Sequence, residues 1–258
     1  MSVFRLEDVS PSRLDDLVWV CSRGRSTPSH LRGVELKKAW VLEMLDRWGP
    51  VAKIAYAGGQ PVGQVLYYPA SMDPDTRHLG YTVLYIRCIY CPFPEHQRMG
   101  IGRALLEAVI GEAVERGFKA VVASGFNTGE YLPLPEFYRR MGFKHTGVEN
   151  YYVLTLRGEP PRPQPRAPRP LPGDEGRALV FYSPKCQFSL EFAESVKRLI
   201  ESVLPSYPVV LINYWEEPGE FLSRGRPAVM VNGVEIRAWA WDREQFIKEV
   251  LRAAGGGQ

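Results

Sequence analysis

A proline-rich run in the middle of the chain divides it into two parts. Residues 158–173 read GEPPRPQPRAPRPLPG, in which proline alternates largely with arginine. Proline has no amide hydrogen for a helix or a sheet ladder, so such a run favours an extended spacer over a packed element. Sequence typical of regular structure lies on both sides, which favours a spacer over a signalling ligand. We therefore expect one domain at 1–157, a linker at 158–175 and a second domain at 176–258.

The composition excludes several classes of protein. The net charge is only +3, without the concentrated basic face that nucleic-acid binding requires. No apolar run approaches the roughly 18 residues of a membrane span, and the N-terminal residues lack the pattern of a secretory signal. Four cysteines are too few for a disulfide scaffold in 258 residues. We expect a cytoplasmic protein that binds neither nucleic acid nor a membrane; its oligomeric state stays open, a homodimer included.

The first part shows alternating strand and helix patterns. Expected strands cover 3–7, the hairpin at 51–68, 81–91, 119–125 and the segment 143–157, and expected helices cover 11–22, 33–48, 100–117 and 135–142. These assignments follow apolar periodicity, glycine and proline punctuation, and the Gly58-Gly59-Gln60 turn. The order β-α-α-β-β-β-α-β-α-β predicts an α/β (α+β) fold with a mixed central sheet and flanking helices.

The second part has a different order of elements. RALVFYS at 177–183 and the segment around 207–215 read as strands, with a helix expected at 187–203 between them. A loop or short helix then precedes a hairpin around Asn232-Gly233, and a helix capped by Asp242 closes the chain. The order β-α-β-(α)-β-β-α predicts a smaller, complete α/β domain.

A glycine-containing turn before the helix at 100–117 is the feature most closely tied to chemistry. The turn is Gln97-Arg98-Met99-Gly100-Ile101-Gly102. A helix N-terminus offers N–H groups without intrahelical partners, and its dipole adds partial positive charge. The two glycines let a ligand approach the backbone, and Arg98 and Arg103 can add charge, so the turn suits a pyrophosphate. Because it lacks the third glycine of a Rossmann fingerprint and the lysine of a Walker A loop, the turn alone could be structural.

The surroundings of this turn resemble a known family. The run PEHQRMGIGRALL at 94–106 is similar to the acetyl-CoA signature Q/R-x-x-G-x-G/A of the GNAT N-acetyltransferase superfamily. EFYRRMGF at 136–143 resembles the second signature of that family, F-Y-x-x-x-G-F. The resemblance covers about residues 3–157 and includes the order of the elements. It implies an enzyme that uses acetyl-CoA as cosubstrate, needs no metal, and transfers the acetyl group directly to a primary amine through a tetrahedral intermediate.

The resemblance also implies positions for the cofactor. The pyrophosphate would bind the N–H groups of the turn, and the pantetheine arm would lie beside the end of the strand at 81–91, in a gap where that strand diverges from the strand at 119–125. Pro92 departs from the family, since it offers no amide there. The implied cofactor-binding residues are Tyr90, Cys91, Phe93, Gln97, Arg98, Met99, Gly100, Ile101, Gly102, Arg103 and, as a weaker candidate, Asn127.

Tyr138 is the implied catalytic residue. Acetyl transfer to an amine releases a thiolate, which a positioned phenol can protonate; the alternative is a core aromatic residue. The general base is left open between Glu35, Glu95, His96 and Glu130, each of which could equally be a solvated surface residue.

Two cysteines flank the implied cofactor groove. Cys88 and Cys91 stand three residues apart on the expected strand, so their side chains should face opposite sides and make poor partners for one disulfide or one metal. With no His–Cys cluster in the sequence, buried structural cysteines are favoured over an acyl-cysteine or a zinc site.

The second part resembles a thioredoxin-like domain over about 176–254. Cys186-Gln187-Phe188-Ser189 follows a strand and opens a helix, which favours a thiolate, and Pro227 stands at the place of the cis-proline of that family. The pattern is C-x-x-S instead of C-x-x-C, so dithiol exchange cannot occur within the chain. Cys186 is a possible redox thiol that could form mixed disulfides; a redox-silent module that docks a partner or shapes the acceptor site is equally compatible.

Three functions follow from these features. The first is an acetyl-CoA-dependent N-acetyltransferase. Its acceptor stays open between a small amine, an antibiotic, an amino acid and a protein N-terminus, because the resemblance implies an acceptor site on variable loops and helices, here residues 20–48 and 126–135. The second is a non-catalytic acyl-CoA sensor coupled to a thioredoxin-like binding or monothiol redox module. The third is a redox protein acting through Cys186 alone.

Overall fold

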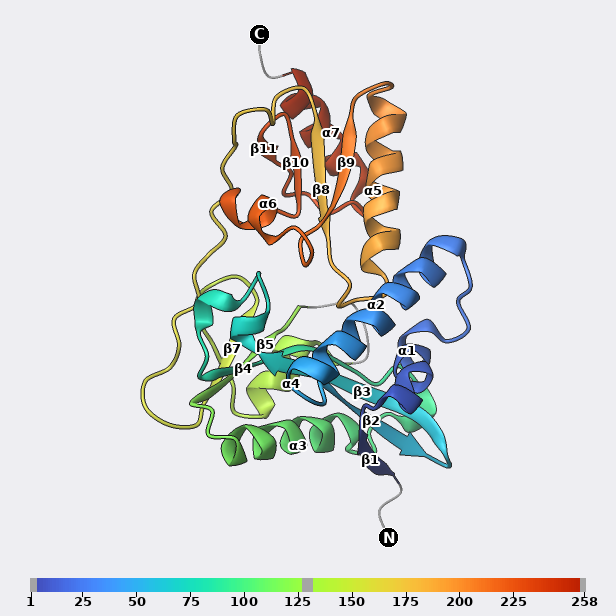
Figure 1. The fold of residues 1–258 in the computed structure, drawn as a ribbon, viewed down its shortest axis with the longest axis vertical. Coiled ribbons are helices and arrows are strands. Elements are labelled where there is room, and N and C mark those ends of the chain that lie inside the picture. Colours follow the sequence, from blue (N-terminus) through green and yellow to red (C-terminus); the bar gives the residue numbers. More distant parts are fainter. Residues whose placement is uncertain (1–3, 127–131, 256–258) are drawn as a thin grey trace. The chain divides into compact units, whose positions relative to one another are not determined.

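The chain forms two separate β-sheets with helices packed on them (Figure 1). The computed structural model describes residues 4–126 and 132–255. Contacts divide the chain into two units, the first comprising Met1–Arg25 with Lys38–Pro165 and the second Ser26–Lys37 with Arg166–Gln258. The second unit therefore includes a short segment from the early part of the chain.

In the N-terminal half, the described residues form seven strands and four helices. The strands are β1 (Arg5–Asp8), β2 (Ala52–Ala57), β3 (Gln60–Pro69), β4 (Val83–Tyr90), β5 (Ala120–Ser124), β6 (Lys144–His145) and β7 (Tyr151–Thr155). The helices are α1 (Leu14–Ser22), α2 (Pro28–Arg47), α3 (Ile101–Glu115) and α4 (Leu134–Arg140). Short 3₁₀ turns cover Pro11–Arg13, Ala70–Met72, Arg77–Leu79 and Pro94–His96.

The sheet of the first unit is mixed, as the sequence predicts. Its strand order is β1-β2-β3-β4-β5-β7-β6. All neighbours pair antiparallel except β4 and β5, which are parallel because α3 forms the crossover between them. The segment 143–157 forms a two-strand hairpin, β6–β7, in place of the single strand expected, and α2 begins at Pro28, five residues earlier than the sequence indicates.

Alternation along β3 assigns its side chains to two faces. A Cβ built on Gly63 would approach Ile101 and Leu105 of α3, so this position faces α3. Gln64 faces the other side, where its amide contacts Cys21 of α1. Trp40 of α2 packs against Tyr68 on that same side, with ring centroids 5.5 Å apart. The central sheet therefore has α3 on one face and α1 with the end of α2 on the other (Figure 1).

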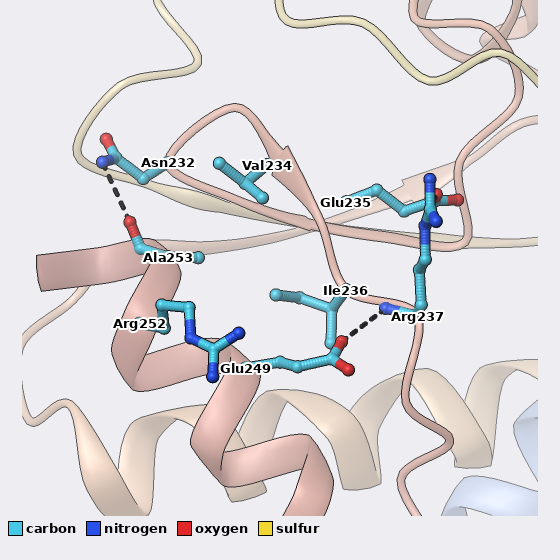
Figure 2. Close-up of a pocket in the computed structure, with 8 residues that line it drawn as sticks. All are labelled: Asn232, Val234, Glu235, Ile236, Arg237, Glu249, Arg252 and Ala253. Carbon is cyan, nitrogen blue, oxygen red and sulfur yellow. Dashed lines mark hydrogen bonds and ion pairs between the residues drawn. The ribbon is translucent and has the colours of Figure 1, made fainter. Parts of the chain in front are cut away.

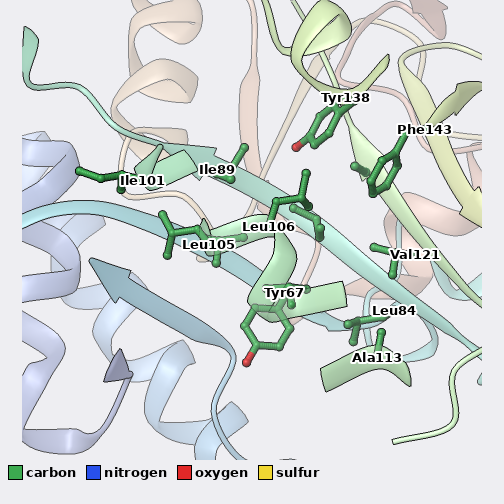
Figure 3. Close-up of a cluster of buried hydrophobic side chains, with 14 of the residues drawn as sticks. Tyr67, Leu84, Ile89, Ile101, Leu105, Leu106, Ala113, Val121, Tyr138 and Phe143 are labelled. Atoms are coloured by element: carbon green, nitrogen blue, oxygen red, sulfur yellow. The ribbon is translucent and has the colours of Figure 1, made fainter. Parts of the chain in front are cut away.

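The main hydrophobic core lies between the sheet and α3. Figure 3 shows side chains of α3, including Leu105, Leu106 and Ala113, beside residues of the central strands. Tyr138 and Phe143 extend this cluster toward α4 (Figure 3). Burial of these apolar side chains fixes α3 and, with it, the turn that precedes it.

The second unit contains a four-stranded sheet in the order β11-β10-β8-β9. Its elements are β8 (Ala178–Tyr182), α5 (Ser189–Val203), β9 (Val209–Asn213), α6 (Pro218–Ser223), β10 (Val229–Val231), β11 (Val234–Glu235) and α7 (Arg243–Gly255). Strands β8 and β9 are parallel, whereas β10 pairs antiparallel with both β8 and β11. Asn232 and Gly233 both have positive φ, which confirms the hairpin predicted there.

Part of the proline-rich run packs on the second unit. The amide of Ala167 donates to the carbonyl of Gly225 at 3.2 Å, and the amide of Arg169 donates to that of Arg224 at 3.1 Å. These two non-proline residues supply the donors that their proline neighbours lack. A side chain on Gly225 would overlap the carbonyl of Ala167, so glycine is required there. Only residues 158–165 of the expected linker belong to the first unit.

The segment 26–37 packs beside the Cys186 turn within the second unit. A Cβ on Gly33 would overlap the carbonyl oxygen of Gln187. The buried Lys37 donates to Gln187 Oε1 at 3.3 Å, and the rings of His30 and Phe188 lie 4.9 Å apart. These contacts explain why α2 begins at Pro28: its first turns have a packing partner that local sequence does not reveal.

Among the described residues, no helix is long and apolar enough to cross a membrane.

Candidate active site

A cavity of about 410 Å³ opens between the end of β4, the start of α3 and α4. Its lining combines apolar side chains with one imidazole and two guanidinium groups, and within residues 4–126 and 132–255 it includes no carboxylate. The lining residues are Cys88, Ile89, Tyr90, Cys91, His96, Gln97, Arg98, Gly100, Ile101, Gly102, Arg103, Phe126, Leu132, Leu134 and Phe137. An apolar channel with a basic end suits a ligand with a narrow chain and a polyanionic group.

The predicted turn forms the basic end of this cavity. Arg98 and Gly100 both have positive φ, 61° and 81°, which bends the chain into the first turn of α3. Gly100 immediately precedes Ile101, so the free amides of the first helical turn lie at the cavity wall. A Cβ on Gly102 would meet Phe137 only at 3.8 Å, an ordinary contact. The protein itself therefore tolerates a side chain at 102, and the absence of one leaves room for a ligand.

Strands β4 and β5 separate where the cavity begins. Their last parallel pair is Ile86 with Ala123, yet β4 continues to Tyr90. A bulge against β3 leaves Arg87 unopposed at this point. From Cys88 onward, the edge of β4 that β5 no longer covers can pair with an extended ligand.

Cys88 and Cys91 both line the cavity, but from different faces of the sheet. Cys88 pairs with Leu66 on the Gln64 side, whereas Cys91 Sγ lies next to Gly63 on the α3 side. Neither thiol forms a disulfide within the described residues. Burial raises the pKa of Cys91 to about 12, with a further contribution from Cys88, so this thiol stays protonated at neutral pH and is a poor nucleophile.

Tyr138 lies beneath the cavity wall. Its neighbour Phe137 lines the cavity, whereas Tyr138 is fully buried in the core, with its ring near Phe143 and Tyr152. The hydroxyl group has no hydrogen-bond partner in the described part of the chain. Burial raises the pKa of Tyr138 well above its ordinary value; Cys88 and Tyr85 raise it further, and Arg87 opposes them. The phenol is therefore protonated, and it lies near Cys88.

The other predicted residues fall into three groups. Phe93 and Met99 pack against the hydrophobic core and are not part of the cavity lining. Asn127 and the candidate base Glu130 lie outside the described residues. Of the remaining candidate bases, His96 lines the cavity, whereas Glu95 is exposed and Glu35 is exposed in the second unit.

Two glycines outside the motifs also shape the site. A Cβ on Gly63 would lie 2.8 Å from Cys91 Sγ, and a Cβ on Gly125 would lie 3.0 Å from the ring of Tyr138. Neither was among the predicted site residues. The only signal in the sequence is a glycine within or just after a strand, which indicates close approach without naming the partner.

The second unit has a cavity of its own, of about 400 Å³ (Figure 2). It lies between the β10–β11 hairpin and α7, and none of the predicted site residues lines it. Its polar groups are largely paired internally: Glu249 accepts from the amide of Arg237, and Asn232 Nδ2 donates to the carbonyl of Ala253 (Figure 2). Glu249 also accepts from the amide of Ala238.

Cys186 is free and partly exposed in the turn before α5. Ser189, at the position of a second cysteine, accepts a hydrogen bond from the amide of Ser183 through its hydroxyl oxygen at 3.1 Å. The described chain has no cis peptide bond, so the bond before Pro227 is trans, unlike the cis-proline of the thioredoxin-like family. In the part of the chain that the structure describes, no cluster of three or more His, Cys, Asp or Glu residues could hold a metal ion.

Comparison with known proteins gives one family and a set of similar structures. Residues 14–143 match the model of the acetyltransferase (GNAT) family. No curated protein matches the chain significantly. Similar structures include an N-acetyltransferase from Staphylococcus aureus Mu50 (16% identity, 60% of this chain and 99% of that chain, TM-score 0.45) and Ard1 from Thermoplasma volcanium (17%, 60% and 99%, TM-score 0.43). A further one is a GNAT family acetyltransferase from Brucella melitensis in complex with acetyl-CoA (16%, 64% and 95%, TM-score 0.43).

Proposed function

The chain belongs to the acetyltransferase (GNAT) family, and from this premise we propose that it transfers the acetyl group of acetyl-CoA directly to a primary amine. As a member of this family it is an acetyl-CoA-dependent acetyltransferase. The acceptor class, the site residues and the role of the second unit are the parts that we propose.

The cavity of the first unit fits the cosubstrate in shape and charge. The amides of the first turn of α3, together with Arg98 and Arg103, would hold the pyrophosphate. The free edge of β4 at Tyr90 and the segment at Cys91 would hold the pantetheine arm. Pro92 has no amide to offer, so we expect the hydrogen bonds to the arm to come from the residues on either side of it.

The unpartnered hydroxyl of Tyr138 is the observation that most supports catalysis over passive binding. Burying the Tyr138 hydroxyl group without a hydrogen-bond partner costs free energy. A phenylalanine would fill the same space without this cost if the residue had only a structural role. During transfer a bond forms between the amine nitrogen and the acetyl carbon, and the bond from that carbon to sulfur breaks. The sulfur then needs a proton, and a protonated phenol near Cys88 can supply it.

The nitrogen must lose a proton in the same reaction. His96 is the candidate base that lines the cavity, and an imidazole can accept this proton directly or through water. The thiol of Cys91 stays protonated, which favours direct transfer over an acyl-enzyme.

We further propose that the second unit is a thioredoxin-like module with a structural or monothiol role for Cys186. The element order and the sheet order β11-β10-β8-β9 support this. The serine at 189 and the trans bond before Pro227 are departures that favour a docking module over a dithiol oxidoreductase. We place its boundary near Arg166, because the second half of the proline-rich run packs on it.

Binding of acetyl-CoA to two glycine variants of α3 tests the location of the site. Gly102→Asp places a negative charge at the proposed pyrophosphate site, whereas Gly111→Asp places the same charge later on the same helix, where a Cβ meets nothing within 4 Å. We expect calorimetry to show at least tenfold weaker binding for Gly102→Asp and unchanged binding for Gly111→Asp.

Equal binding by both variants would contradict this site. Wild-type protein that binds acetyl-CoA tightly but acetylates no primary amine in a broad screen would instead support an acyl-CoA sensor.

A further inference from the structure

Gln64 lies on the face of the sheet opposite the proposed cofactor helix. It is the direct antiparallel partner of Tyr90, and Leu66 is the partner of Cys88. Directly opposed residues of an antiparallel pair share a face, so Gln64, Cys88 and Tyr90 lie on the same side of the sheet. Gly63 shows that α3 packs on the other side. A ligand that contacts the Gln64 side chain therefore approaches from the face away from α3.

The cavity extends to this face. Ile89 belongs to the core on the α3 side, whereas Cys88 and Tyr90 are on the Gln64 side, and all three line the cavity. Residues of both faces line it because β5 has ended and no longer closes the edge of β4. The face with Gln64 is consequently where a second substrate would meet a donor that enters beside α3.

The amide of Gln64 is buried with one end unsatisfied. The residue is 1% exposed; Nε2 donates to Cys21 Sγ at 2.7 Å, and Oε1 has no partner in the described residues. Turning the amide over would exchange the two ends and still leave one without a partner. A buried amide that served only packing would be better replaced by an apolar side chain of the same length. Gln64 is not part of the cavity lining, but its pair partner Tyr90 is, so a ligand bound beside Tyr90 is the nearest candidate for the missing partner.

We propose that Gln64 positions the acceptor amine by accepting a hydrogen bond from its N–H group through Oε1. This inference rests on the proposed acetyl transfer to a primary amine. A neutral primary amine has two N–H groups, so it can donate one to Gln64 and still direct its lone pair at the acetyl carbon. Gln64 takes up no proton and is a positioning residue.

Three variants of the full-length protein test this role, with propylamine as the acceptor and released CoA thiol as the signal. Gln64→Met keeps the length of the side chain and removes the oxygen, and Gln64→Glu keeps an oxygen. Gln60→Met is the matched control, because Gln60 is exposed at the start of the same strand. We expect Gln64→Met to raise the KM of propylamine roughly tenfold, with the KM of acetyl-CoA changed less than twofold and the thermal midpoint equal or higher.

Recovery of the KM of propylamine in Gln64→Glu, with no change in Gln60→Met, would support the role further. An unchanged KM of propylamine in Gln64→Met would overturn it, as would a lower thermal midpoint with equal effects on both KM values, which indicates a structural amide. Wild-type protein that binds acetyl-CoA but does not acetylate propylamine or any other primary amine would overturn the proposed function itself.

Discussion

Tyr138 combines the environment of a core residue with the chemistry of an acid. Its ring packs among aromatic side chains, and Gly125 leaves room for it, since a Cβ there would lie 3.0 Å from the ring. Burial raises the pKa of the phenol, so the hydroxyl group stays protonated at physiological pH. The neighbouring Phe137 lines the cavity, whereas Tyr138 is buried in the core, so two adjacent residues of α4 face different environments.

The Tyr138→Phe variant tests the acid role. We expect kcat to fall about 10²-fold or more, the range of general acid catalysis, while acetyl-CoA binding stays unchanged. The fold should be at least as stable as wild type, because the lost hydroxyl has no partner in the described structure. Steady-state kinetics and a thermal melt measure the two effects. A variant with wild-type kcat would show that Tyr138 is a core residue only.

At the scale of elements, the contact between β3 and α3 sets the width of the site. Gly63 on β3 lies against Cys91, and it also faces Ile101 at the start of α3. The bulge between β3 and β4 and the end of the β4–β5 pairing lie within a few residues of this contact. Together they hold the end of β4 at a fixed distance from the helix N-terminus.

A double-mutant cycle tests this contact. Gly63→Ala should destabilise the first unit by about 1–3 kcal/mol, because the new methyl group would lie 2.8 Å from Cys91 Sγ. It should also weaken acetyl-CoA binding by moving Cys91. Adding Cys91→Ala removes the clash and should restore most of the stability, as measured by urea unfolding. Additive losses in the double variant would mean that the sulfur is not what limits space at residue 63.

At the scale of the whole molecule, the proline-rich run is only partly a spacer. Its last residues lead to Asp174, a buried carboxylate that accepts hydrogen bonds from Arg224 at 2.8 and 2.9 Å and from Arg177 at 3.1 Å. Burial by itself would raise the pKa of Asp174, but the hydrogen bonds from Arg224, the Leu171 amide and Arg177 outweigh it and lower the pKa to about 2. This ion cluster attaches the run to the second unit.

The stability of the second unit should therefore depend on pH through Asp174. A carboxylate with a lowered pKa stabilises the fold above its unfolded pKa of about 3.9, and this contribution is lost as the pH falls toward about 2. At pH 7 we expect Asp174→Asn to destabilise the unit by about 2–4 kcal/mol, because the buried Arg224 loses its buried charge partner and keeps only the half-exposed Glu220. The difference from wild type should shrink as the pH is lowered from about 5 to 2.

Hydrogen exchange of the β8 amides measures the stability of the second unit separately from that of the first. Glu175→Gln, which changes an exposed carboxylate next to Asp174, serves as the control and should behave like wild type. A difference between wild type and Asp174→Asn that stays constant from pH 7 to 3 would contradict the lowered pKa.

The sequence by itself determined the features that depend on neighbouring residues. The turn at 97–102, the start of α3 and the Asn232-Gly233 hairpin follow from glycine conformations, helix ends and apolar periodicity, all of which act within a few positions. The mixed first sheet follows from the same local patterns, because a helix between two strands permits parallel pairing.

Only the tertiary structure decided which of these residues meet. Phe137 lines the cavity and Tyr138 packs in the core, because only one side of α4 packs on the sheet. The sequence motif alone does not reveal which of the two residues lies on that side. The contacts of Gly33 with Gln187 and of Ala167 with Gly225 join residues more than 50 positions apart. Such contacts depend on the shapes of complete units, and no local pattern in a single sequence encodes them.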